Sequence, residues 1–544
     1  MTLHWPQART RSDRPWGSVL TALILIIGVL CAWFLTVRAD REMREDLLAR
    51  TQLVAEAVNL KRIQALTGSE ADLESPEYLR LKEQFAAIRA ADPQCRVVYL
   101  IGRKADGTVF IFVDSEPLDT EDYVPPGLNY EEVTADELRV FDTAFPLAMG
   151  PYDNRWGTWI AAQVPLTDPQ TGTVLAVLGM NIDAREWWWN VAGRVAPPVG
   201  LAVLALIAIV FAGAHLLARR ARTETPPRWM WHLEPALFAA VGLVLTLFAA
   251  WLAQEASNRN QVGAFRHLAE SRTAAFAEVL RSLRDIEIEG LAKFYENSES
   301  VPDEKFQDYA SFLTRNPAIQ AWGWAPAVSS NEKDRFERAA QAAGMDGFII
   351  WERDDEDHRI PADGRDVYYP LFRGAPDDVS QPVMGYDLGS DSIRRRAIDE
   401  ALRTGFPTAT EPVRLQESGR PPGMLVFRPV FADAVFRHPR GLALAVLRLE
   451  VALEVVIADS VMGADLLLIR GDQSMEALAS SWAADTTPNG ALSFQRPVLA
   501  FGKTFLVRAH AGPDFLRAQP ARGGLIATLL GLWLTAAVAI NNLR

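Results

Sequence analysis

The sequence predicts an α+β membrane protein in which four transmembrane helices carry two folded domains outside the cytoplasm. The chain has 544 residues, more than the roughly 300 that a single hydrophobic core usually supports. Four stretches are apolar over most of the about 20 residues that a helix needs to cross a bilayer. The long segments 38–195 and 255–522 separate these stretches, and both mix helical with strand-like patterns.

The predicted spans are 17–37, 199–218, 235–253 and 524–540. Arginines lie before the first span and after the second, at Arg9, Arg11, Arg14, Arg219, Arg220 and Arg222. The positive-inside rule therefore places both of these ends in the cytoplasm. Basic residues also follow the first span, but they alternate with acidic ones at helical spacing, so we expect local pairs there. The first apolar run is longer than the about 7 to 15 residues of a signal peptide and is interpreted as an anchor.

This orientation gives a cytoplasmic N-terminus (1–16), a cytoplasmic loop (219–234) and a cytoplasmic end (541–544). Both large domains then lie outside, and we expect a multi-pass protein of a bacterial plasma (inner) membrane. Tryptophans precede the second and third spans, where amphipathic rings suit the headgroup region, at Trp187, Trp188, Trp189, Trp229 and Trp231.

Composition excludes several classes of protein. The net charge of -13 argues against a nucleic-acid partner, which would require basic surfaces. The only cysteines, Cys31 and Cys95, cannot build a disulfide framework or a cysteine metal site. No phosphate-binding loop, dinucleotide fingerprint or hydrolase motif is present, and no two histidines have metal-ligand spacing. We expect no cofactor, no metal site and no catalytic centre within this chain.

The first outside domain begins with helical periodicity over 39–66, and a second helical stretch follows Pro76. The pair Asp106-Gly107 predicts a hairpin between 96–102 and 108–114. A second hairpin is predicted between 158–166 and 173–182.

This order, together with the closing strand VLGMNID at 177–183, resembles the Cache or PDC-like sensor family. The resemblance implies a PAS-related sheet that cups a small ligand. Asp114, Tyr152, Trp156 and Asp183 are candidates for lining such a pocket. A turn role explains Asp114 equally well, and aromatic residues in such positions more often belong to the core.

The second outside domain begins with a proline-free, apolar-rich stretch that predicts a stalk helix over 255–297. This helix either pairs with its copy in a homodimer or packs only on its own domain, since its apolar pattern is not a strict heptad. Further along, Ser390 or Asp391 is expected to cap a helix that begins near Ser392, and Gly405 is expected to end it.

Several sequence blocks follow the stalk in order: NPAIQAWGWAP (316–326), YYP (368–370), GYDLGSD (385–391) and LVFRPVF (425–431). They resemble the CHASE domain, the extracellular sensor of many histidine kinases and nucleotide cyclases. The resemblance implies two PAS-like lobes after the stalk, a distal one at 300–455 and a proximal one at 457–513. In the proximal lobe we expect strands at 465–470 and 504–510.

The resemblance also implies ligand contacts. In hormone-binding members of the family, an aspartate that matches Asp387 accepts hydrogen bonds from an adenine-type ligand, which suits an acceptor-only carboxylate. The alternative is a loop aspartate satisfied by the backbone. Ala409 and Ser418 fall at or near further contacts, but Ala409 replaces a bulky aliphatic residue. We therefore expect a related purine or another small planar molecule rather than a cytokinin.

Aromatic residues of the same blocks are candidates for the apolar wall of this pocket, with a core role as the alternative: Trp322, Trp324, Tyr369 and Phe427. Two functions then compete. The first is a receptor input module that signals across the membrane to a histidine kinase or a cyclic-di-GMP output, located on a continuation of the chain or on a partner. The second is an extracytoplasmic enzyme or membrane scaffold without signalling output.

Overall fold

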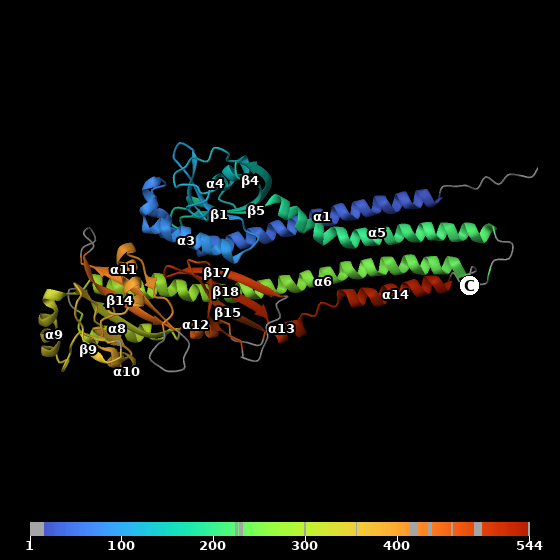
Figure 1. Ribbon diagram of the computed structural model, residues 1–544. Coiled ribbons are helices and arrows are strands. Elements are labelled where there is room, and N and C mark those ends of the chain that lie inside the picture. The colour runs from blue at the N-terminus through green and yellow to red at the C-terminus, as the bar shows by residue number, and fades with distance from the viewer. Residues whose placement is uncertain are drawn as a thin grey trace, which may run out of the picture. The chain divides into compact units, whose positions relative to one another are not determined.

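The computed structural model describes residues 16–222, 227, 232–298, 301–354, 356–413, 423–432, 438–457, 461–482 and 492–541 (Figure 1). Several residues used above lie outside this set, namely Arg9, Arg11, Arg14, Trp229, Trp231 and Ser418. The chain divides into two compact units. One unit comprises Met1–Asp46, Asp183–Ala264 and Gln519–Arg544, and the other comprises Leu47–Ile182 and Phe265–Ala518.

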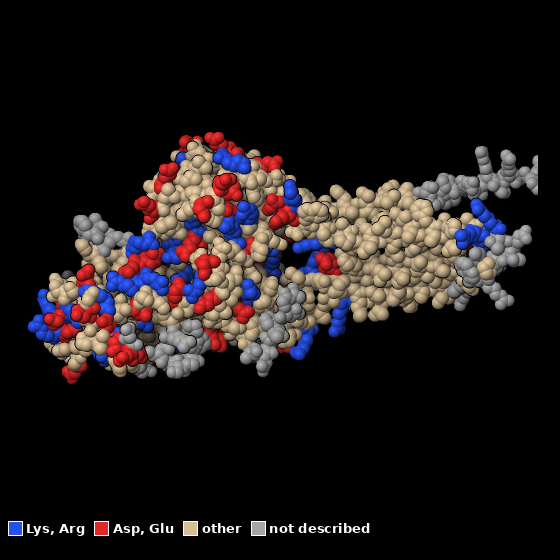
Figure 2. All heavy atoms as spheres, viewed as in Figure 1, with Lys and Arg blue, Asp and Glu red and all other residues tan. Residues whose placement is uncertain are grey.

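The first unit consists of long helices: α1 (Trp16–Ala57) and α6 (Leu233–Ser282), which both continue into the second unit, α5 (Ala184–Arg222) and α14 (Gly523–Asn541). All four are long and apolar enough to cross a membrane. Figure 2 shows a long stretch of surface over these helices without acidic or basic side chains. Large apolar side chains such as Trp33 and Phe211 point outward there. Such a surface is expected of helices that are solvated by hydrocarbon.

The predicted local ion pairs are present in α1, as Arg38 with Glu42 and Arg44 with Asp40. Asp40 also accepts a hydrogen bond from the indole nitrogen of Trp187 at 2.8 Å. Trp187 is therefore buried within this unit, unlike its neighbours Trp188 and Trp189, which are exposed. Of the predicted belt residues that the structure describes, Trp188 and Trp189 are exposed, as a membrane-surface belt requires.

The first domain is built on a five-stranded sheet with the strand order β2-β1-β5-β4-β3. Its elements are α2 (Leu60–Gln64), η1 (Glu70–Glu74), α3 (Pro76–Ala91), β1 (Val97–Arg103), β2 (Val109–Asp114), α4 (Ala135–Thr143), β3 (Leu147–Asn154), β4 (Gly157–Thr167) and β5 (Val174–Asp183). The hairpin expected at Asp106-Gly107 is present between β1 and β2. Gly107 has a φ of 91°, and the Asp106 carboxylate accepts from the backbone N–H of Thr108.

The side chains of β1 alternate between the two faces of this sheet, as strand geometry requires. Val98 and Leu100 are fully buried on one face. Tyr99 and Ile101 point to the other, where Ile101 joins an apolar cluster with Val177 of β5. The candidate site described below lies on this second face.

In the second domain, α6 continues through the π-helical turn η3 (Leu283–Glu287) into α7 (Ile288–Glu296). The first sheet has the order β11-β6-β14-β13-β12. Its strands are β6 (Ile319–Pro326), β11 (Arg373–Ala375), β12 (Thr408–Ala409), β13 (Met424–Phe431) and β14 (Pro439–Leu447). Further elements here are α8 (Asp303–Leu313), β7 (Val328–Ser329), η4 (Ser330–Glu332), α9 (Lys333–Ala342), β8 (Trp351–Arg353), β9 (Arg359–Pro361), β10 (Val367–Tyr368), α10 (Asp377–Ser380), η5 (Gln381–Val383) and α11 (Ser392–Thr404).

A second sheet follows with the order β16-β15-β18-β17. Its elements are α12 (Leu449–Val456), β15 (Met462–Ile469), β16 (Met475–Ser480), β17 (Ser493–Ala500), β18 (Lys503–Ala511) and α13 (Pro513–Ala518). The strands expected at 465–470 and 504–510 correspond to β15 and β18, which pair antiparallel. The two sheets of the second domain are therefore formed by consecutive segments of the chain.

The ends of α11 follow the sequence prediction. Asp391 is the N-cap, and its carboxylate accepts from the backbone N–H groups of Ile393 and Arg394. Gly405 ends the helix with a φ of 77°, the left-handed conformation that glycine adopts without steric cost.

Candidate functional site

A pocket of about 100 Å³ opens on the face of the first domain's sheet that carries Tyr99. Its wall is mainly aromatic and apolar, with a few polar groups that converge on it, as in many small-molecule sites. The residues used below are Tyr99, Asp114, Tyr130, Tyr152, Asn154, Trp156, Trp159 and Asn181. They come from β1, β3, β4 and β5, from the end of β2 and the loop after it, and, for Trp156, from the turn between β3 and β4.

The structure places three of the four predicted pocket residues in this wall, namely Asp114, Tyr152 and Trp156. The fourth, Asp183, has a different role. Its carboxylate accepts hydrogen bonds from the backbone N–H groups of Arg185 and Glu186, and it thereby caps the start of α5.

The tyrosine hydroxyls of the pocket are neutral. Burial raises the pKa of Tyr130 to about 12 and raises the pKa values of Tyr99 and Tyr152 above their usual range. Each hydroxyl is therefore able both to donate and to accept a hydrogen bond. The pocket offers these groups to a ligand without adding negative charge.

Asn181 on β5 carries a polar group that the protein leaves without a partner. Its side chain is 4% exposed, and the amide nitrogen donates to the Tyr152 hydroxyl at 3.3 Å. The other end of the amide, Oδ1, has no hydrogen-bond partner among the described residues. Leaving a buried polar atom unsatisfied costs about 1–3 kcal/mol. A ligand that donates a hydrogen bond would remove this cost.

A row of hydrogen bonds leads from the pocket to α4. The amide of Gln163 on β4 donates to the Tyr99 hydroxyl at 3.0 Å and to the Glu137 carboxylate at 2.9 Å. Glu137 in turn accepts from the backbone N–H of Thr134, which is the N-cap of α4 in a complete capping box. Burial raises the pKa of Glu137. The first turn of α4 is therefore bonded to a side chain of the pocket wall.

Asp114 lines the pocket but is already paired. Its carboxylate lies 2.7 Å from the Lys82 ammonium on α3 and accepts from the backbone N–H groups of Glu116 and Val124. Burial raises the pKa of Asp114 and lowers that of Lys82, and their mutual attraction opposes both shifts. We assign Asp114 to holding the loop between Glu116 and Val124 beside the pocket.

Comparison with known families identifies the second domain. Residues 299–478 match the family model for the CHASE domain. The chain contains a CHASE domain. This confirms the family that the order of sequence blocks predicted, over most of the second domain. Among curated protein sequences, none matches the chain.

Several solved structures with similarity to the chain are sensory or ligand-binding domains. The ligand-binding domain of the Pseudomonas aeruginosa amino acid chemoreceptor PctC, with GABA, is 16% identical, covering 46% of this chain and 97% of its own, at a TM-score of 0.27. The sensory domain of the Campylobacter jejuni chemoreceptor Tlp3, with isoleucine bound, is 10% identical. The match covers 50% of this chain and 98% of that domain, at a TM-score of 0.27. A domain of a putative sensory box/GGDEF family protein from Vibrio parahaemolyticus is 11% identical. The match covers 47% of this chain and 99% of that domain, at a TM-score of 0.27. These values are too low to indicate a ligand for this chain.

Within the CHASE domain, Asp387 is fully buried. Its Oδ1 accepts from the backbone N–H groups of Tyr369 at 2.8 Å and Gly389 at 3.1 Å. Its Oδ2 has no hydrogen-bond partner among the described residues, and it lies 3.4 Å from the guanidinium of Arg365. The contacts of Oδ1 fit the alternative interpretation, a loop aspartate held by the backbone, while Oδ2 leaves an acceptor position open. Ligand contact by Asp387 stays a prediction.

The other predicted residues of the CHASE domain occupy core positions. Tyr369 and Phe427 belong to one apolar cluster. Trp322 and Trp324 lie on β6, and the Trp324 ring stacks on Tyr295 with centroids 3.8 Å apart. Ala409 on β12 is also buried. The structure thus brings Tyr369 and Phe427 together, and it leaves the buried indole nitrogen of Trp322 without a hydrogen-bond partner among the described residues. Ligand contact by the aromatic set stays a prediction.

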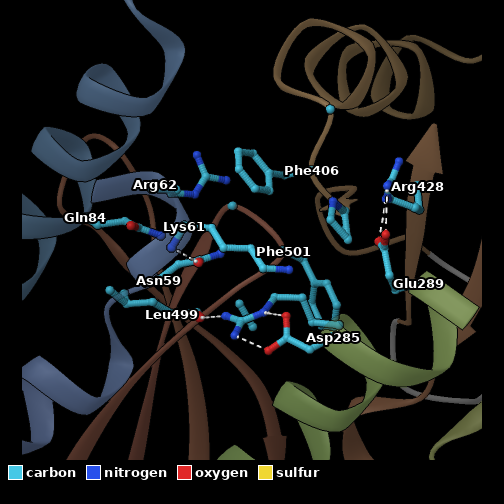
Figure 3. Close-up of a pocket in the computed structure, with 15 residues that line it drawn as sticks. Asn59, Lys61, Arg62, Gln84, Asp285, Glu289, Phe406, Arg428, Leu499 and Phe501 are labelled. Carbon is cyan, nitrogen blue, oxygen red and sulfur yellow. Dashed lines mark hydrogen bonds and ion pairs between the residues drawn. The ribbon is translucent and has the colours of Figure 1, made fainter. Parts of the chain in front are cut away.

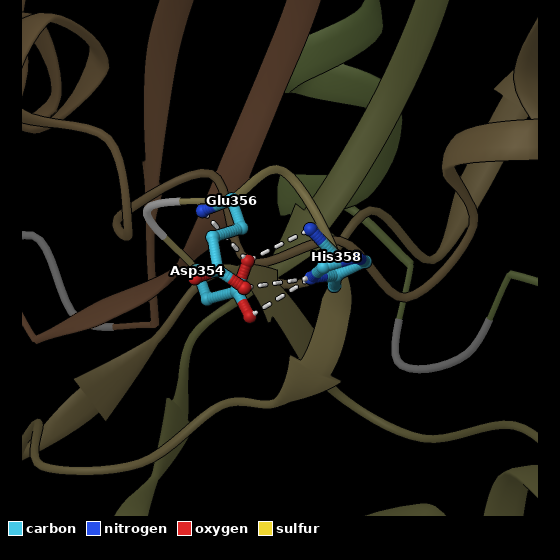
Figure 4. A group of neighbouring side chains, drawn as sticks. All are labelled: Asp354, Glu356 and His358. Atoms are coloured by element: carbon cyan, nitrogen blue, oxygen red, sulfur yellow. Dashed lines mark hydrogen bonds and ion pairs between the residues drawn. The ribbon is translucent and has the colours of Figure 1, made fainter.

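One exposed group has metal-ligand chemistry (Figure 4): Asp354, Glu356 and His358 in the turn between β8 and β9, with ligand atoms within 4.8 Å of one another. The Asp354 carboxylate already accepts from the backbone N–H groups of Glu356 and His358, which explains the turn. We assign no metal site here.

Proposed function

We propose that this protein is a ligand-sensing membrane receptor whose first domain binds a small molecule in the pocket beside Asn181. The observation that carries this proposal is the unpartnered end of the buried Asn181 amide within an aromatic wall. The ligand class that fits has an apolar or planar body and at least one hydrogen-bond donor. Amines, amino acids and purines share that chemistry.

In its finer form, the proposal places both folded domains outside a bacterial plasma membrane, with four spans and a dimeric receptor. Ligand binding shifts the membrane helices between two arrangements and thereby regulates a cytoplasmic histidine kinase or diguanylate cyclase. A ligand shifts such an equilibrium only through different affinity for the two states. The membrane-length helices and the CHASE domain support this form.

An extracytoplasmic enzyme is supported less well. The tyrosines of the pocket are neutral, and Asp114 is already engaged by Lys82 and two backbone N–H groups. Among the described residues that line this pocket, no nucleophile lies beside a free general base. Binding is the activity that this arrangement supports best.

The test is a thermal-shift screen of the purified full chain in lipid nanodiscs with amino acids, amines and purines. A hit is expected to raise Tm in a saturable manner. Asn181→Leu removes the free acceptor and is expected to abolish the shift. Asn129→Ala is the matched control, because Asn129 lies in the same domain, is exposed and is outside the pocket wall. A panel without any hit, or a hit that Asn181→Leu leaves unchanged, would refute the site.

A further inference from the structure

A second pocket, of about 110 Å³, lies within the second compact unit (Figure 3). Its walls come from α2 and α3, from the helical segment of η3 and α7, from the loop after α11 and from the turn between β17 and β18. Four basic and two acidic side chains line it, so the wall carries excess positive charge. In this respect it differs from the aromatic pocket of the first domain.

Arg62 on α2 is the decisive side chain of this pocket. The residue is 4% exposed, and among the described residues its side chain has neither an ion pair nor a hydrogen bond, its Nη1 atom being fully buried. The guanidinium lies over the ring of Phe406 at 4.8 Å. A buried charge without a counter-charge is costly, and proteins usually pair such groups. Glu77 and Glu400 are near enough to act on the charge of Arg62, but no carboxylate of the described residues forms an ion pair with it.

The neighbouring guanidinium groups are compensated, as Figure 3 shows. Arg284 lies 2.7 Å from the carboxylate of Asp285, and Arg428 lies 2.7 Å from that of Glu289. Both acidic residues of the wall are thus occupied by other arginines. Burial, with the charge of Arg80 in addition, lowers the pKa of Arg62 to about 10, so Arg62 remains charged at neutral pH.

Two further polar side chains line the cavity with Arg62. Lys61 is exposed and adds a second positive charge, and the amide of Gln84 is 5% exposed. A guanidinium binds carboxylate and phosphate groups through two parallel hydrogen bonds, which gives both geometric selectivity and strength. The cavity volume limits the bound group to a small one.

We propose that this pocket binds a small oxyanion, either a carboxylate or a phosphate, with Arg62 as the principal contact and Lys61 as a second. The site is separate from the pocket beside Asn181 and does not depend on the function proposed for it. The anion would neutralise Arg62 and connect α2 with the loop that carries Phe406.

The test uses the purified full chain in lipid nanodiscs, titrated separately with inorganic phosphate and with acetate. Sodium chloride at equal ionic strength serves as the reference. We expect at least one of the two anions to raise Tm saturably above the chloride reference, and the stronger one identifies the anion class. Arg62→Gln is expected to abolish this rise. Arg103→Gln is the matched control, since Arg103 also lies over a phenylalanine ring, that of Phe141, but has its own carboxylate partner in Asp142.

A second readout separates a binding role from a structural one. Without added oxyanion, Arg62→Gln is expected to leave Tm unchanged or to raise it, because the substitution removes an unpaired buried charge. If Arg62→Gln fails to fold, Lys61→Gln tests the site instead, and it is expected to weaken anion binding severalfold without a change in the anion-free Tm. The proposal is wrong if neither anion exceeds chloride, or if Arg62→Gln or Lys61→Gln keeps the full anion response.

Discussion

Asn181 in the first domain and Asp387 in the CHASE domain are both buried polar side chains near a sheet, but their surroundings differ. The Asp387 carboxylate receives two backbone N–H groups and lies beside Arg365. The Asn181 amide has one partner, Tyr152, and leaves its other end free in a pocket wall. Each side chain nevertheless keeps one buried oxygen without a hydrogen-bond partner among the described residues, Oδ2 of Asp387 and Oδ1 of Asn181. The surroundings of the open oxygen distinguish the two sites: the guanidinium of Arg365 faces Oδ2 of Asp387, whereas Asn181 lines a pocket.

The largest effect is expected for Asp387→Ala. This change leaves the Tyr369 and Gly389 N–H groups without acceptors, at a cost of about 1–3 kcal/mol each. It also removes one of the two carboxylates beside Arg365, which keeps Glu352. We expect a fall in the Tm of the full chain on the order of 10 °C. Unchanged Tm together with lost ligand binding would reverse the comparison and place a ligand site at Asp387.

Asn181→Leu is expected to have a much smaller effect on stability in the absence of ligand. Only one hydrogen bond is lost, and an unsatisfied polar atom is removed at the same time, so the free energy of unfolding should change by less than about 1.5 kcal/mol. Chemical denaturation of the full chain measures this difference. A loss as large as that for Asp387→Ala would mean that Asn181 has a structural role.

Asp391 tests how much burial contributes to the role of Asp387. Like Asp387, it accepts hydrogen bonds from two backbone N–H groups, but it is half-exposed. Replacing an N-cap aspartate by alanine costs about 1 kcal/mol. Asp391→Ala is therefore expected to lower Tm by much less than Asp387→Ala. Equal losses in the two variants would show that burial contributes nothing to the role of Asp387.

The smallest effect concerns acid stability. Burial acts to raise the pKa of Glu289, but hydrogen bonds and the charge of Arg428, with Lys293 and Lys61 in addition, outweigh it and lower the pKa below 4.5. A carboxyl with a lowered folded pKa contributes stability above its unfolded pKa, and this contribution is lost as the pH falls through the folded value. Glu296 also faces Arg428, at 3.7 Å. We expect Tm to fall less steeply below pH 4.5 in Glu289→Gln than in the wild type.

The elements that sequence reasoning found are those with local signals. Asp106-Gly107, Asp391 and Gly405 act through turn and cap chemistry that involves only a few neighbouring residues. β3 was not predicted. It contains Pro151, a residue that sheets accept mainly in edge strands, and β3 is an edge strand. The capping box at Thr134 and Glu137 was a signal that would have located α4.

The candidate site was predicted only in part. Tyr152 and Trp156 were suggested by residue type, but the free amide of Asn181 depends on which partner reaches it across the sheet. The contact of Asp387 with the Tyr369 N–H spans 18 residues of chain, so sequence alone left both of its roles open. Arg62 gave no sequence signal at all, since its isolation results from the burial of a short helix against distant loops. An asparagine within the apolar strand of β5 was the signal available for the first pocket.

The hydrogen bonds from Tyr99 through Gln163 and Glu137 to Thr134 couple the first turn of α4 to the occupancy of the pocket. A ligand that competes for the Tyr99 hydroxyl weakens the hydrogen bond from Gln163 to that hydroxyl. The bond from Gln163 to the Glu137 carboxylate then changes, and with it the bond from the Thr134 backbone N–H to the same carboxylate. Deuterium uptake at the Thr134 and Glu137 amides, followed by mass spectrometry, would then register a molecule that touches neither of them.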